Sequence, residues 1–320
     1  MATNRTAVAT ASAGLLAACL VNIDDDLVSR ASRDSEGGES GNNIEAGDGG
    51  LEASREALEA SVEAGRPLDA GIGDGCAHRN PPARTGEAPC PSDMASIAKP
   101  NGGTYCMDRT EVTVGAYQAF MAARVPLCAQ PPACAFNGTY LPGGWATDGA
   151  PPTGAAYPVG TVNWCGAYVY CWWMGKRLCA AIDGGSIPYF GNDFADPERD
   201  EWFRACSNGG ATLYPYGDAY APNACVGSDH PIVGPLPVAQ PVSCTGNVPV
   251  INLSGNVMEW EDACGGRDPG ICDAGGPECD FCHTRGGSFQ RSGVTMACAS
   301  NESIPRGQGY TELGFRCCAD

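Results

Sequence analysis

Nineteen cysteines in 320 residues constrain this chain more than any other feature of its sequence. The thiols of cytosolic proteins are kept reduced, and such proteins rarely contain so many cysteines. Exported proteins pair their cysteines as disulfides. The 44 glycines and 25 prolines together make up about a fifth of the chain, which favours loops over long helices. The sequence therefore predicts an exported, disulfide-stapled protein with little regular secondary structure.

The first cysteine, Cys19, stands apart from the others and ends the segment Leu16-Ala17-Ala18-Cys19. An aliphatic residue, two small residues and a cysteine form a lipobox, whose cysteine is lipidated and becomes the mature N-terminus. Residues 1–18 would then be a signal peptide. The alternative is a chance cysteine after an alanine-rich start. Setting Cys19 aside leaves an even number of cysteines, which can all pair, so we expect a lipoprotein of the bacterial cell envelope, anchored in the outer membrane.

An acidic segment without Cys, Trp, Tyr or Phe follows the lipobox. Residues 20–75 hold 14 Asp and Glu against 4 Arg, a net charge of −10. Such a segment cannot bury enough apolar surface to offset the entropy lost on ordering. We interpret residues 19–88 as a disordered tether and residues 89–320 as one domain, a length that a single core can support.

The charge of the whole chain excludes two classes of partner. The net charge is −18 and the isoelectric point about 4.4, whereas nucleic acids and anionic lipid surfaces both attract clusters of Lys and Arg. No apolar run reaches the length of about 20 residues that a spanning helix needs. We expect contact with the membrane through the lipid anchor alone, and no nucleic acid.

Three helices and two late strands are predicted within the domain. Thr113 and Asn163 stand where N-caps would, before the apolar segments 114–121 and 164–174, and Gly175 follows the second of these. A third, short helix covers residues 200–206. Segments 285–289 and 313–318 are typical of strands. The expected fold class is α+β.

Six segments, taken in order, resemble one protein family. They are EVTVGAYQAF (111–120), PVGTVNWCGAYVYCWWMGKRL (158–178), EWFRAC with LYPYGD (201–206, 213–218), LSGNVMEWED (253–262), RGGSF (285–289) and LGFRC (313–317). By these six segments, the chain is identified as a member of the sulfatase-modifying-factor family. This family includes the formylglycine-generating enzymes. The resemblance spans about residues 100–318 and implies a loop-rich variant of the C-type-lectin-like fold.

The resemblance also implies two disulfides. By analogy with the family, the cysteine that ends the second helix bonds the one after GFR, which gives Cys171–Cys317. A second family bridge corresponds to Cys206–Cys298. Three further pairs are suggested by proximity in the sequence alone: Cys128–Cys134, Cys165–Cys179 and Cys225–Cys244.

The family's oxidases convert a substrate cysteine to formylglycine with O₂ and copper, and they need two cysteines just after the GGS element. Those two positions fall here on Arg291 and Gly293. Thiolates are the soft ligands that copper(I) prefers, and neither residue supplies one. Ser288 and Trp260 match residues that line the family's copper and oxygen site, but these positions can equally be retained for packing. We therefore predict that this chain does not carry out copper chemistry.

Calcium is the metal that the resemblance favours. The family binds it through the GNxxEW loop, where the side chains of Asn256 and Glu259 match, with Ser254 and Val257 as donors of backbone carbonyls. Hard oxygen ligands suit Ca²⁺. The alternative is a purely structural loop. A second family site would use Asn223 and the carbonyl of Ala224.

One further segment, Cys279-Asp-Phe-Cys282-His283, has the form of a haem-attachment or zinc motif. In an exported chain we favour disulfides for these cysteines. The leading interpretation of function is a non-catalytic structural or binding module that contacts an envelope protein or a glycan. The alternative is a formylglycine-generating oxidase or a related oxidoreductase.

Overall fold

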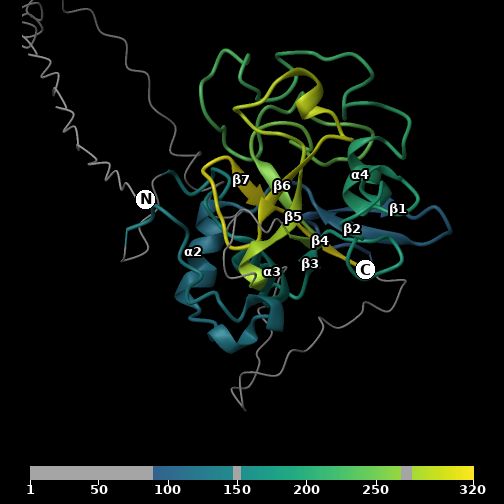
Figure 1. The fold of residues 1–320 in the computed structure, drawn as a ribbon. Helices are drawn as coiled ribbons and strands as arrows, with labels where there is room; N and C mark the ends of the chain where they lie inside the picture. Colours follow the sequence, from purple (N-terminus) through teal and green to yellow (C-terminus); the bar gives the residue numbers. More distant parts are fainter. Residues whose placement is uncertain (1–88, 147–152, 268–275) are drawn as a thin grey trace, which may run out of the picture. The chain divides into compact units, whose positions relative to one another are not determined.

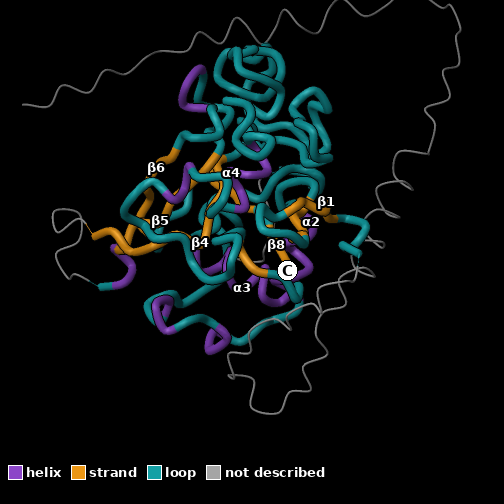
Figure 2. Tube along the Cα trace, turned by 90° about the vertical axis from the view of Figure 1, so that its right-hand side faces the viewer, coloured by secondary structure: helices purple, strands orange, loops and turns teal. Residues whose placement is uncertain are grey.

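Two small sheets, three α-helices and long loops make up the part of the chain that the structure describes (Figure 1). This structure is a computed structural model, and it describes residues 89–146, 153–267 and 276–320. The predicted signal peptide, lipobox and tether lie outside these residues. Loops occupy most of the traced chain (Figure 2), and the predicted loop-rich α+β class is confirmed.

The strands form two separate four-stranded sheets. The first has the order β1-β2-β8-β3, and all its neighbours are antiparallel. Its strands are β1 (Met94–Ala98), β2 (Thr104–Asp108), β8 (Cys317–Ala319) and β3 (Arg177–Leu178). The second has the order β6-β5-β4-β7, in which only β4 and β7 run parallel. Its strands are β6 (Asn301–Pro305), β5 (Asp280–Arg285), β4 (Met258–Arg267) and β7 (Leu313–Phe315).

Two helices begin after the predicted caps Thr113 and Asn163, and the third begins one residue after its predicted start, because Asp200 caps it. The helices are α2 (Val114–Ala122), α3 (Trp164–Trp173) and α4 (Glu201–Cys206). The side chains of Thr113, Asn163 and Asp200 each accept a hydrogen bond from a backbone N–H of the first turn, which satisfies donors that a helix start leaves free. Gly175 follows α3 with a φ of +70°, as a helix-ending glycine should.

Five short 3₁₀ turns complete the elements among the described residues: η1 (Leu127–Ala129), η2 (Pro132–Cys134), η3 (Asp193–Ala195), η4 (Pro277–Cys279) and η5 (Gly293–Met296).

The two late strands differ from the prediction. Segment 285–289 is not a strand, because β5 ends at Arg285 and Gly286 and Gly287 turn the chain with φ of +82° and +65°. Segment 313–318 is not one strand but two, β7 and β8, which belong to different sheets. Arg316 is the single residue between them, so the chain passes from one sheet to the other at that position.

Both disulfides implied by the resemblance are present. Cys171 bonds Cys317, and Cys206 bonds Cys298. The proximity guess Cys225–Cys244 is also confirmed.

The other two proximity guesses are wrong. Cys134 and Cys165 bond each other, because η2 lies beside the start of α3, and Cys179 bonds Cys318. Cys128 is disulfide-bonded, but not to Cys134.

Two adjacent cysteines in β8 link the two larger hydrophobic clusters. Consecutive side chains of a strand point to opposite faces, so Cys317 and Cys318 leave β8 in opposite directions. Cys317 bonds Cys171 within the cluster built on α2 and α3, and Cys318 bonds Cys179 within the cluster that holds Trp202. The last strand therefore fastens both cores covalently.

Two further disulfides, Cys90–Cys106 and Cys264–Cys282, bring the bridges with both partners described to seven. Every cysteine in the described residues is disulfide-bonded, which indicates an oxidising compartment outside the cytosol. In the same stretches of chain, no helix is both long and apolar enough to cross a membrane.

Candidate functional site

The predicted calcium loop lies at the junction between the sheets, and its acidic residue already has a cationic partner. Glu259, in β4, accepts hydrogen bonds from the Arg316 guanidinium at both oxygens, at 2.6 and 2.7 Å. The indole of Trp202 donates a third bond to the same carboxylate, at 2.9 Å. Glu259, Arg316 and Trp202 are each about 1 % exposed. This is the bidentate geometry in which an arginine binds a carboxylate most firmly.

Asn256 is engaged in the same way by protein groups. Its side-chain oxygen accepts a bond from the backbone N–H of Leu236 at 2.9 Å, and its amide donates to Glu111 at 2.8 Å. Asn252 donates to the other oxygen of Glu111 at 3.2 Å. Burial raises the pKa of the Glu111 carboxyl to about 7; Arg316 opposes the rise and Glu259 adds to it.

These contacts do not fit a calcium ion held by Asn256 and Glu259. A cation on Glu259 would have to displace a buried guanidinium and would meet its positive charge. Ser254, which was predicted to offer its backbone carbonyl, is buried and donates its hydroxyl to the carbonyl of Met296, and Asn223 is exposed. Within the described residues, no group of three or more His, Cys, Asp or Glu side chains is placed to hold a metal. In this structure Asn256 and Glu259 belong to a buried network with Arg316 and Glu111, and calcium binding by them stays a prediction.

The positions of the family's copper cysteines form an ion pair and a turn. Arg291 binds both oxygens of Glu302, in β6, at 2.6 and 2.8 Å. Gly293 begins η5 with a φ of +58°. A guanidinium stays protonated and cannot act as a soft metal ligand. Cys298, the next cysteine along the chain, is bonded to Cys206.

Ser288 and Trp260 have structural partners of their own. Both are almost completely buried. The Ser288 hydroxyl accepts a bond from the backbone N–H of Gln290 at 3.2 Å, and the Trp260 indole donates to the carbonyl of Val162 at 2.9 Å. These contacts account for both side chains by packing and turn formation.

A second buried charge cluster surrounds the arginine of the RGGS segment. Arg285, Asp200 and Glu261 are all fully buried, and Arg285 Nε lies 3.7 Å from Glu261. Burial raises the pKa of Asp200 to about 6, against the effect of Arg285. Burial and the neighbouring Asp200 together raise the pKa of Glu261 well above its usual range. Two carboxyl groups share one arginine, so this cluster holds a proton more readily than isolated carboxylates do.

The haem or zinc motif is disulfide-bonded, as the favoured interpretation predicts. Cys282 bonds Cys264, and Cys279 is disulfide-bonded as well. Burial and the nearby Arg285 lower the pKa of the His283 imidazole to about 4. His283 instead packs between the rings of Tyr189 and Phe194. Neither thiol of the motif is available to a metal or a haem.

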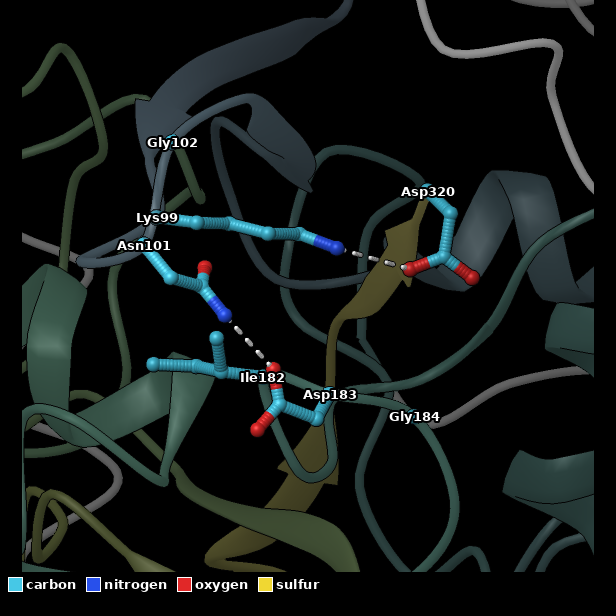
Figure 3. Close-up of a pocket in the computed structure, with 7 residues that line it drawn as sticks. All are labelled: Lys99, Asn101, Gly102, Ile182, Asp183, Gly184 and Asp320. Atoms are coloured by element: carbon cyan, nitrogen blue, oxygen red, sulfur yellow. Dashed lines mark hydrogen bonds and ion pairs between the residues drawn. The ribbon is translucent and has the colours of Figure 1, made fainter.

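A polar hollow of about 480 Å³ lies between the β1–β2 turn and the end of β8 (Figure 3). Its polar groups face one another: Lys99 pairs with Asp320 at 3.6 Å, and Asn101 donates to Asp183 at 3.1 Å. It holds none of the predicted site residues, and its polar groups satisfy each other rather than pointing at a ligand.

Sequence reasoning found Glu259 and Asn256 but missed the partners that define their role. Glu111, Trp202 and Arg316 all lie inside the segments that identify the family, in EVT, EW and GFR. Their co-occurrence was the available signal. It did not reveal that Arg316, 57 residues from Glu259 along the chain, would form the ion pair with the Glu259 carboxylate.

The fold and these contacts agree with the family comparison. Residues 93–320 match the model of the FGE-sulfatase family, described as a sulfatase-modifying factor enzyme 1-like domain. The chain belongs to this family. No curated protein sequence is detectably similar to it.

Several solved structures are similar in fold. CarF shares 20 % identity, with 68 % of this chain and 86 % of that chain covered and a TM-score of 0.44. Treponema denticola variable protein 1 shares 19 %, with 71 % and 94 % covered and a TM-score of 0.45. PvdO from Pseudomonas aeruginosa shares 17 %, with 70 % and 91 % covered and a TM-score of 0.46.

Proposed function

We propose that this protein is an exported binding module of the cell envelope that uses the sulfatase-modifying-factor fold without its copper–cysteine chemistry. One observation carries the proposal: the positions of the two reactive cysteines hold Gly293 and an Arg291 that is locked to Glu302. Disulfide bonding of every described cysteine supports it, since copper oxidation of a thiol requires free thiolates.

Thiol content and oxidase activity test this proposal together. Titration of the denatured, unreduced protein should find essentially no free cysteine. A peptide carrying Cys-x-Pro-x-Arg, incubated with the protein and copper(I), should keep its thiol when examined by mass spectrometry. An active formylglycine-generating oxidase serves as the positive control. Catalytic, copper-dependent conversion of the peptide cysteine to an aldehyde would establish the alternative function, an oxidase.

We further propose that Cys19 carries a lipid that anchors the module to the envelope membrane. The support is the lipobox of residues 16–19. The Cys19→Ser protein should move from the membrane fraction to the soluble fraction, because the thioether-linked lipid can no longer form. Cell fractionation and mass measurement of the N-terminal peptide check this, with Cys19-containing protein as the control. A variant that stays in the membrane fraction contradicts the anchor.

A further inference from the structure

Three loops lie side by side beyond α4 and carry a cluster of tyrosines. The loops are residues 213–220, 225–230 and 288–298, which form part of the green and yellow loops at one end of the domain (Figure 1). Tyr214 stacks on Tyr216, with ring centroids 5.4 Å apart, and donates its hydroxyl to the carbonyl of Gly293 at 3.3 Å. Tyr220 donates to Asp229 at 2.7 Å. The loops are therefore joined by direct contacts.

The outer surface of these loops combines apolar side chains with carboxylates. Val294 is 80 % exposed and Leu213 is 57 % exposed, and Tyr216 and Tyr220 are partly exposed beside them. The tyrosine face, as we name it, consists of Leu213, Tyr216, Asp218, Tyr220, Asp229 and Val294. Exposed apolar groups clustered with aromatic side chains are typical of interaction sites.

Within the described residues, no cationic side chain pairs with the carboxylates of the tyrosine face. Asp218 and Asp229 are exposed, and their interactions are with uncharged donors, the backbone N–H of Leu213 and the hydroxyl of Tyr220. Arg291 lies beside these loops, because its carbonyl accepts a bond from Ser228. Its own charge is neutralised by Glu302. A partner that binds here meets two carboxylates that are paired with no cation in the part of the chain that the structure describes.

The loops are held in place before any partner arrives. Cys298 is bonded to Cys206 in α4, and Cys225 is bonded to Cys244. A side chain at Gly227 would come within 2.7 Å of the Arg291 carbonyl, so the loops pack closely there. Binding surfaces that are rigid in the free protein lose little entropy when a partner docks.

We infer that the tyrosine face binds a cationic polypeptide segment, in which arginine side chains stack on Tyr216 and Tyr220 and pair with Asp218 and Asp229. Guanidinium groups suit this surface because they stack on aromatic rings and also bind carboxylates. The inference rests on the proposed function and names the class of partner that the module takes.

Fluorescence polarisation with defined peptides tests the inference. The probe is a labelled 12-residue peptide of alternating arginine and serine, and its control has citrulline in place of every arginine. Citrulline keeps the shape of the side chain and removes its charge. The purified full chain should bind the arginine peptide and not the citrulline peptide. Equal binding of both peptides, or no binding of the arginine peptide, overturns the inference.

Two opposite substitutions at Val294 locate the binding. Val294→Arg should raise the dissociation constant of the arginine peptide about fivefold, the effect of one like charge at the surface, and Val294→Glu should lower it by a similar factor. Both variants should melt at the wild-type temperature, because the side chain is exposed. Phe190→Arg and Phe190→Glu are the controls, since Phe190 is 75 % exposed on a different loop, and both should bind like wild type.

Any attraction of the cationic peptide to the acidic residues 20–75 would be the same in every variant and cancels in these comparisons. If the two Val294 variants change the dissociation constant by the same factors as the two Phe190 variants, the peptide binds elsewhere and the inference fails. Selective binding of an N-acetylglucosamine oligomer, lost in Val294→Arg and Val294→Glu alike, would assign the face to glycans instead and also overturn it. Either failure leaves the thiol and oxidase results unaffected, so the proposed function is judged separately.

Discussion

Replacing Arg316 with methionine should destabilise the domain by about 3–5 kcal/mol, the cost of leaving one member of a buried ion pair without its partner. Arg316 provides two bonds to Glu259 and two more to the carbonyls of Asp108 and Ile251. It also stands where the chain passes from β7 to β8. Its loss should therefore loosen the junction of the two sheets. Urea unfolding of the unreduced protein measures the change in free energy of unfolding.

A double-mutant cycle separates the ion pair from simple loss of packing. Glu259→Gln in the Arg316→Met background removes the uncompensated carboxylate and should recover part of the lost stability, while Glu259→Gln alone leaves the guanidinium unpaired and should destabilise. Arg124→Met is a matched control, because Arg124 is exposed and should change stability little. If the effects of Arg316→Met and Glu259→Gln simply add, the two side chains are not coupled and the network described here is wrong.

Local features of the fold could be predicted because they depend on neighbouring residues. The predicted caps Thr113 and Asn163 each accept a bond from a backbone N–H only three residues ahead. The type of residue and the apolar pattern that follows it are enough to identify such positions. The turn at Gly286 and Gly287 was not predicted, because an apolar strand pattern does not indicate which glycines adopt a positive φ.

Long-range partners could not be read in the same way. Cys134–Cys165 depends on where η2 lies relative to α3, and closeness in sequence pointed to the wrong pairs. Cys171–Cys317 was predicted only through the family resemblance. The resemblance pointed to Glu259 as a charged group that pairs with a cation, but it did not indicate Arg316, whose guanidinium the structure places there. Which charge satisfies a buried carboxylate depends on three-dimensional packing.

Removing both disulfides of β8 should lower the free energy of unfolding by more than the sum of the losses that each removal causes alone. With Cys171–Cys317 and Cys179–Cys318 both present, the second bridge closes a ring of only about ten residues, so losing either alone should cost about 3 kcal/mol. Once one is absent, the other closes a much larger loop between β3 and β8, about 50 residues along the shortest path because Cys206–Cys298 bypasses the residues between them. Loss of the remaining bridge should then cost about 4–5 kcal/mol.

Alanine pairs test this non-additivity. The Cys171→Ala/Cys317→Ala and Cys179→Ala/Cys318→Ala proteins, and the protein with all four changes, are compared by urea unfolding without reductant. The fourfold variant should lose about 1–2 kcal/mol more than the two pairs together. Cys225→Ala/Cys244→Ala, combined with either pair, is the control and should add simply, since that bridge spans 19 residues in a separate loop. Simple addition in the fourfold variant would mean that the two bridges of β8 do not constrain the same loop of the unfolded chain.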